Sequence, residues 1–124
     1  MSDTHVMSRH ARLDVLLDGV RITRSASDAA RRGTERVHVV AWDDLAGVSV
    51  ETSKKGRAVV RLQVRGVTPA TDHRLDPFAV KAGSGQGADA LAVAERIEEE
   101  LRTRRRWREL ADPAAPDASA AAGF

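Results

Sequence analysis

The sequence predicts a small, mainly β protein of the α+β class: an antiparallel barrel or sandwich of six to seven strands capped by one C-terminal helix. Two observations carry this prediction. Short segments of alternating apolar and polar residues fill the first two thirds of the chain, and one long segment with helical periodicity follows them. Six strands can be placed, at residues 12–18, 20–23, 35–41, 46–52, 57–65 and 75–81.

The first two expected strands are joined by a tight turn at Asp18-Gly19. In the strand before it, Leu13, Val15 and Leu17 alternate with polar residues. An Asp-Gly pair between two such segments is typical of a type I′ turn, because both central residues of that turn need a positive φ. We therefore predict a β-hairpin in which Leu17 belongs to the buried face.

The middle of the chain is divided by two polar segments and one corner. Residues 25–34 are small and polar, and residues 66–74 contain a proline, so both are predicted to be loops. Between them, the third strand places Val39 on the buried face and His38 on the polar face. Trp42-Asp43-Asp44-Leu45 interrupts the alternation and predicts a corner between two strands.

A long helix is expected over residues 88–110. Its apolar positions recur at helical spacing, and Glu98→Arg102 and Glu100→Arg104 have the spacing of favourable ion pairs. Such a helix needs a surface to pack on, so it should be part of the fold. The predicted core consists of Val15, Leu17, Ile22, Val39, Val48, Val60, Leu62, Val80, Ile97 and Leu101.

Length and composition indicate one domain. The chain has 124 residues and no cysteine, which excludes disulfides and thiolate chemistry. We expect a flexible N-terminus at 1–10, one domain at 11–110 and a disordered Ala/Pro-rich tail at 111–124. The first ten residues lack an apolar signal segment, which predicts a cytoplasmic protein. Abundant Ala and an excess of Arg over Lys are typical of a GC-rich bacterial genome.

No residue pattern predicts catalysis, a metal or a cofactor. The four histidines lack the spacing of zinc ligands, and no G-x-S-x-G nucleophile motif occurs. Asp43 and Asp44 are neighbours at a corner, which favours backbone capping over paired acid–base chemistry. Gly83-Ser84-Gly85 precedes the last element, whereas a dinucleotide site needs a following strand. A phosphate or sulfate on the N–H groups at the helix start stays open.

The stretch Val39-Val40-Ala41-Trp42-Asp43-Asp44-Leu45-Ala46-Gly47-Val48 resembles the strand–corner–strand passage of bacterial pleckstrin-homology-like (PH-like) domains. Phe78-Ala79-Val80 and the helix over residues 88–106 continue the resemblance, which covers about residues 11–107. Two departures are the count of six strands, where the family has seven, and the bare Asp18-Gly19 turn, where phosphoinositide-binding members have a longer basic loop. The resemblance implies a binding or assembly module and does not imply catalysis.

Basic residues are the remaining candidates for a site. Residues 102–108 contain five arginines and Trp107, a composition that suits an anionic membrane, an acidic partner or nucleic acid. Arginines at a helix C-terminus also stabilise the helix dipole, so a structural role stays open. The candidate residues for an anionic partner are Arg31, Arg32, Lys54, Lys55, Arg57, Arg104, Arg105 and Arg108.

The function predicted from the sequence is a non-enzymatic binding module that acts through a protein partner or in an assembly, including a homo-oligomer. The alternative is a peripheral adaptor, which would bind an anionic membrane surface or nucleic acid through the Arg-rich helix end and the basic loops. In that alternative the protein would lie at the inner face of the membrane. No small-molecule cofactor is expected.

Overall fold

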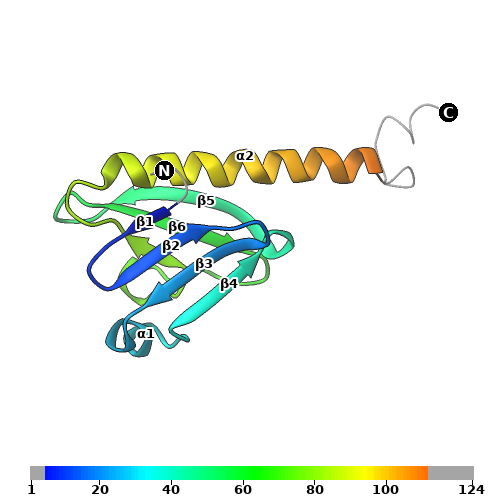
Figure 1. The fold of residues 1–124 in the computed structure, drawn as a ribbon. Coiled ribbons are helices and arrows are strands. Elements are labelled where there is room, and N and C mark those ends of the chain that lie inside the picture. Colours follow the sequence, from blue (N-terminus) through cyan, green and yellow to red (C-terminus); the bar gives the residue numbers. More distant parts are fainter. Residues whose placement is uncertain (1–4, 112–124) are drawn as a thin grey trace.

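The structure, a computed structural model, describes residues 5–111. These residues form seven antiparallel strands in two sheets, with a long helix at the C-terminal end (Figure 1). The predicted fold class, mainly β within the α+β class, is therefore confirmed. The tail expected at 111–124 lies outside the described residues except for Ala111, which ends the last helix.

The first sheet has four strands in the order of the chain, and the second has three. The strands of the first sheet are β1 (His5–Met7), β2 (Ala11–Val15), β3 (Gly19–Arg24) and β4 (Val37–Ala41). Those of the second are β5 (Leu45–Thr52), β6 (Ala58–Val64) and β7 (Ala79–Lys81). The helices are α1 (Ala26–Arg32) and α2 (Gly87–Ala111), with 3₁₀ turns at Trp42–Asp44 and His73–Leu75.

The two sheets form a sandwich and not a closed barrel. No strand ladder within residues 5–111 joins the first sheet to the second. The chain passes between them at the predicted corner, where Trp42–Asp44 makes a 3₁₀ turn. Trp42 is buried there, and its indole Nε1 donates a hydrogen bond to the carbonyl oxygen of Leu17 at 3.0 Å. The corner is thereby tied to the β2–β3 turn.

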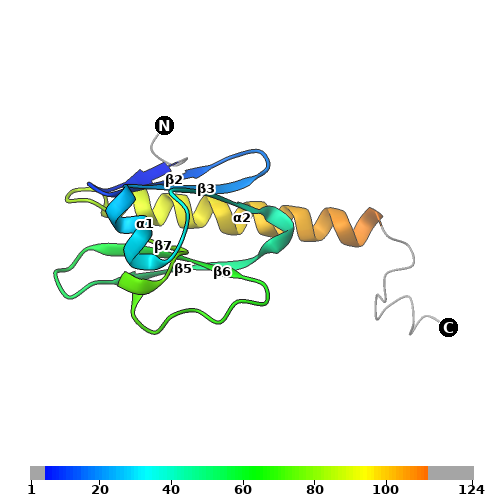
Figure 2. The same cartoon turned by 90° about the horizontal axis from the view of Figure 1, so that it is seen from below.

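Helix α2 covers the opening between the two sheets (Figure 2). Its buried residues are Ala90, Val93, Ala94 and Ile97, and they join the core formed by both sheets. Eight of the ten predicted core residues belong to this core. Ile22, Val60, Leu62, Val80 and Ile97 are buried in it, and Val15, Val48 and Leu101 are partly buried against it. The predicted packing of the helix against the strands is therefore confirmed.

The N-terminal segment contains a strand that the sequence analysis missed. We predicted residues 1–10 to be flexible, but β1 pairs with β2, and Val6 is fully buried in the core. The strand has only three residues, so it is too short to show a clear alternation. The strand is held in place by its pairing with β2 and by its contacts with α2, and both of these depend on the tertiary structure.

The expected loop at 25–34 is also wrong, since it contains α1. Ser25 caps this helix by accepting a hydrogen bond from the backbone N–H of Asp28, and Gly33 ends it in the left-handed conformation. Both capping signals are present in the sequence. A helix of seven residues, however, has too few apolar positions to show a periodic stripe.

The Asp18-Gly19 turn is not of type I′, because neither residue has a positive φ. Gly19 is needed for another reason: a Cβ at this position would lie 2.1 Å from the carbonyl oxygen of Val40. Without the tight turn, the strand ends at Val15, and Leu17 is 87% exposed instead of buried. The prediction of Leu17 as a core residue was therefore wrong.

The register of β4 differs by one residue from the predicted one. Val40 is buried opposite Val20, while Val39 is exposed, so the prediction of Val39 in the core was wrong. A shift by one residue exchanges the two faces of a strand. His38 accordingly lies half-buried, and its ring packs edge-on against Phe78 with centroids 5.4 Å apart.

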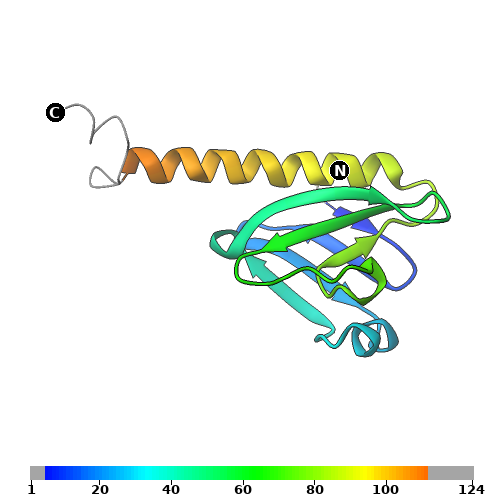
Figure 3. The ribbon, with the colours of Figure 1, turned by 180° about the vertical axis from the view of Figure 1, so that it is seen from behind.

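The segment between β6 and β7, residues 65–78, lies over the outer face of the second sheet. The predicted last strand at 75–81 is therefore shorter, and its first residues belong to this covering segment. Both Val59 and Val60 are fully buried, although they point to opposite faces of β6. Figure 3 shows the segment beside the second sheet, away from α2.

Candidate functional site

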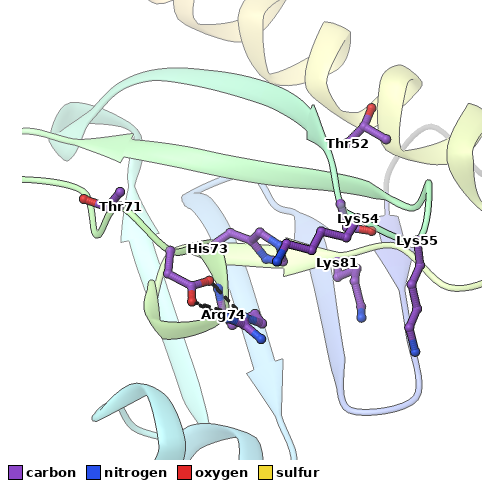
Figure 4. A pocket seen from close by; sticks show the side chains of 9 residues that line it. Thr52, Lys54, Lys55, Thr71, His73, Arg74 and Lys81 are labelled. Atoms are coloured by element: carbon purple, nitrogen blue, oxygen red, sulfur yellow. Dashed lines mark hydrogen bonds and ion pairs between the residues drawn. The ribbon is translucent and has the colours of Figure 1, made fainter.

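A basic pocket of about 630 Å³ lies beside the end of the second sheet. Two segments that are distant in sequence form it, together with the last residue of β7. The β5–β6 turn supplies Lys54 and Lys55, the segment before β7 supplies His73 and Arg74, and β7 supplies Lys81 (Figure 4). Its volume is in the range of small-ligand pockets. The pocket is complete on one chain.

Three lysines give the pocket its positive charge. Lys54, Lys55 and Lys81 make no ion pair within residues 5–111. The charge of Arg74, by contrast, is balanced by Asp72, whose carboxylate lies 2.7 Å from the Arg74 guanidinium. Three cations with free donors around one opening are suited to an anionic group.

His73 contributes a polar group without a partner. Its Nδ1 atom is buried and has no hydrogen-bond partner within residues 5–111. Burial lowers the pKa of His73, although the charges of Glu51 and Asp72 act in the opposite direction. The ring is therefore mostly neutral at neutral pH, since the ordinary pKa of histidine is about 6.5. A neutral imidazole can donate or accept a hydrogen bond at this atom.

Three arginines form hydrogen bonds with residues 70–77, the segment that contains Thr71 to Arg74 of the pocket lining. Arg24 donates to the carbonyl oxygen of Pro77 at 2.9 Å, and Arg32 donates to those of His73 and Asp76 at 2.6 and 2.8 Å. Arg61 donates to the carbonyl oxygen of Ala70 and to the Asp76 carboxylate. We call these arginines, with Asp28 and Asp76, the arginine network. It links α1 and the first sheet to the segment that covers the second.

Two buried carboxylates balance this network. Asp28 binds Arg24 at 2.7 Å and Arg32 at 3.1 Å, while Asp76 binds Arg61 at 2.9 Å. Burial alone would raise the pKa of Asp28, but the hydrogen bonds from Arg24 and Arg32 outweigh it, so the pKa lies below its ordinary value. A buried carboxylate between two arginines is stable as an ion, and its task here is structural.

The structure separates the predicted basic residues of the two loops. Lys54 and Lys55 line the pocket, but Arg57 in the same turn does not. Arg32 is almost fully buried in the arginine network, and Arg31 pairs with Asp28 from the surface. Arg32 was predicted to contact an anionic partner, but its guanidinium is occupied by hydrogen bonds to Asp28 and to the carbonyl oxygens of His73 and Asp76.

The arginines at the end of α2 are also divided. Arg104 binds Glu100 at 2.8 Å, reaches the carbonyl oxygen of Leu17 at 3.1 Å and lies over the ring of Trp42 at 5.3 Å. Arg108 approaches Asp43 at 3.6 Å. These two residues connect the helix to the corner, whereas Arg105 is exposed. Part of the Arg-rich end is therefore structural, as one of the two sequence-based alternatives proposed.

Lys81, His73 and Arg74 were missed as site residues. Each is a single polar residue in a segment without a motif, and only the pairing of β7 with β6 brings Lys81 beside the β5–β6 turn. The basic pair Lys54-Lys55 was the one signal of this site in the sequence. The other lining residues come to the pocket through the pairing of strands that are distant in the sequence.

Residues 5–111 contain no group of three or more His, Asp or Glu side chains placed to hold a metal ion. Among the same residues, no helix has the length and apolar character needed to span a membrane.

The fold and the pocket define a class: a mainly β sandwich of two antiparallel sheets, closed by a C-terminal helix and carrying a basic pocket at one end. Comparison with known protein families places it further. Residues 15–98 match the family described as Domain of unknown function (DUF4429), and the chain belongs to that family. No curated protein and no solved structure matches the chain.

Proposed function

We propose that this protein is a non-enzymatic binding module of PH-like architecture, and that the basic pocket is its site for an anionic group. The order of four strands, three strands and a closing helix supports the PH-like assignment. The buried carboxylates Asp28 and Asp76 are both held by arginines, which supports a structural rather than catalytic role for them.

The observation that carries the proposal is that Lys54, Lys55 and Lys81 line one pocket together with His73. Like charges brought together raise the energy of the unoccupied pocket, and an anion relieves that repulsion. Ammonium groups are compact point charges that suit a phosphate or carboxylate of a small ligand, a lipid headgroup or an acidic side chain.

Titration with a simple anion tests this assignment. Inorganic phosphate and pyrophosphate should bind to the full chain at low salt, and the affinity should fall as salt rises. Replacing Lys54, Lys55 and Lys81 together by Gln should weaken binding by at least about tenfold, because each partly exposed charge pair contributes up to about 1 kcal/mol. Calorimetry measures the affinity, and circular dichroism checks the fold.

Arg57→Gln is the matched control, since Arg57 belongs to the same turn but does not line the pocket. It should leave the affinity within about twofold of the wild type, because it removes an exposed, screened charge whose side chain does not line the pocket. Equal losses in the control and the triple variant would show diffuse attraction and reject the pocket. Parallel titrations with anionic vesicles and with an oligonucleotide separate a lipid headgroup from a nucleic-acid phosphate.

A protein partner or an assembly is the second candidate function. The observation that favours it lies at the other end of the molecule, where α2 extends beyond the sandwich and exposes Trp107 and Leu110 (Figure 1).

A further inference from the structure

The last ten residues of α2 form an overhang, residues 102–111, that has no buried residue. It extends past the sandwich at the end opposite the β5–β6 turn (Figure 3), while Arg104 and Arg108 still contact the corner at Trp42 and Asp43. A helix of this length receives little stability from its own backbone and usually depends on packing. The overhang is therefore a helical surface available for a partner, and this inference is independent of the proposed anion site.

One flank of α2 consists of residues at intervals of 4, 3, 4 and 3, which lie on the same side of the helix. Its members are Arg96, Glu100, Thr103, Trp107 and Leu110. The first two form an ion pair with each other at 3.0 Å, and the last two are exposed apolar residues. Thr103 is small and lies in the middle, so another helix can approach closely there.

The most exposed apolar side chains of the molecule gather on this flank. Leu17, Leu110 and Trp107 are 87%, 71% and 66% exposed, more than any other large apolar residue of the described chain. A groove beside the helix is lined by Val15, Leu16, Leu17, Arg96, Glu100 and Arg104. Glu100 and Arg104 also line the hollow next to Trp107. The groove, which is lined by three apolar and three charged residues, thus lies about one helical turn from Trp107.

Charge along this part of α2 is separated into two blocks. Glu98, Glu99 and Glu100 form an acidic block, and five arginines follow within residues 102–108. Two such helices would repel each other in parallel, because arginines would face arginines. An antiparallel pair that crosses near Thr103 sets the acidic block of each helix against the basic block of the other.

We propose that two copies of this chain associate through antiparallel α2 helices that cross near Thr103. In this arrangement each Trp107 lies level with Glu99 and Glu100 of the second copy. It also lies beside the second copy's groove, the one that Leu17 lines. Each Glu99 comes level with the second copy's Arg106, and both residues are exposed on the side of the helix away from the sandwich. The interface is isologous, because the same patch serves on both copies.

Sedimentation of the full chain over a range of concentrations tests the proposal. The wild type should show a monomer–dimer equilibrium. Trp107→Ala and Leu17→Ser should each raise the dissociation constant by at least about tenfold, since a buried tryptophan anchor dominates many interfaces. Leu91→Ser is the control, because Leu91 is an exposed apolar residue on another flank of α2, and it should leave the equilibrium unchanged.

Charge reversal gives a test of the antiparallel orientation. Glu99→Arg and Arg106→Glu should each weaken the dimer, and the two changes combined should restore it, because the pair is exchanged across the interface. A chain that stays monomeric into the millimolar range would overturn the proposal. So would a dimer that keeps its affinity in Trp107→Ala and Leu17→Ser, or a double reversal that binds no better than the single ones.

Discussion

At the scale of single residues, the same side-chain type has different tasks in different surroundings. Arg32 is buried and donates to two backbone carbonyl oxygens, while Arg57 in another loop is exposed. Both are basic loop residues in the sequence. What separates them is the number of acceptors that the fold places within reach, since an arginine has five donors in a fixed geometry.

His73 gives a prediction at this scale. Because its pKa is lowered by burial, the ring is neutral in the free pocket, and a bound anion favours its protonated form. Sulfate affinity should therefore rise as pH falls from 7.5 toward about 5, a range in which sulfate and the carboxylates keep their charge. His73→Gln should bind sulfate with an affinity that is nearly constant over that range. A wild-type affinity independent of pH would contradict the role of His73.

At the scale of elements, α2 has two halves with different surroundings. The first half packs on both sheets through Val93 and Ile97, the ion pair Arg96–Glu100 joins the two halves, and the second half carries the ion pair Glu100–Arg104. Leu101 lies at the change from one half to the other and is partly buried against the core. The first half therefore stabilises the fold, and the second half is available for contacts outside it.

Three alanine substitutions along α2 measure this division. Ile97→Ala should lower the free energy of unfolding by about 2–5 kcal/mol, because it leaves a cavity in the core. Leu101→Ala should lower it by less, and Leu91→Ala by less than about 0.5 kcal/mol, since Leu91 is exposed. Urea denaturation at neutral pH provides the values. Equal losses at positions 91 and 97 would show that the packing of α2 is wrong.

At the scale of the whole molecule, two surfaces lie at opposite ends of one rigid element. The basic pocket is near the start of α2, and the overhang is at its end, with about 37 Å of helix between Gly87 and Ala111. The arginine network joins the two sheets on the side away from α2. Ion pairs and the helix thus close the sandwich from two sides.

Acid unfolding is predicted for the molecule as a whole. The pKa values of Asp28 and of Glu100, which accepts a hydrogen bond from Arg96, both lie below their ordinary values. Such groups contribute their full stability above the unfolded pKa values of about 4, and they lose it as pH falls through the lower folded values. The contribution of these two carboxylates to the free energy of unfolding should therefore be nearly constant from pH 7 to 5 and fall below about 4.

Two variants separate the contributions. Asp28→Asn should lower the free energy of unfolding at pH 7 by about 3–5 kcal/mol, because it leaves the buried Arg24 charge without its carboxylate. Glu100→Gln should reduce the loss of stability between pH 5 and 2.5. Glu98→Gln is the control, since Glu98 makes no ion pair within residues 5–111. A steeper acid loss in Glu100→Gln would contradict this assignment.

Local sequence patterns were sufficient for the fold class, the order of most strands and the bounds of the helix. The predicted helix at 88–110 is found at Gly87–Ala111, and the predicted corner at Trp42 is found as a 3₁₀ turn. These features depend on periodicity and on neighbours in the chain, so a single sequence contains them. Lys54 and Lys55 are neighbours in the sequence, so the basic pair could be predicted as a candidate for the same reason.

Tertiary structure decided what depends on distant segments. It placed β1 beside β2, shifted the register of β4 so that Val40 is buried, and left Leu17 exposed. It also brought Lys81 and His73 to the Lys54-Lys55 turn and surrounded Arg32 with carbonyl oxygens. A charged residue in a sequence can be solvated, buried or part of a site, and only its acceptors in space determine which of these it becomes.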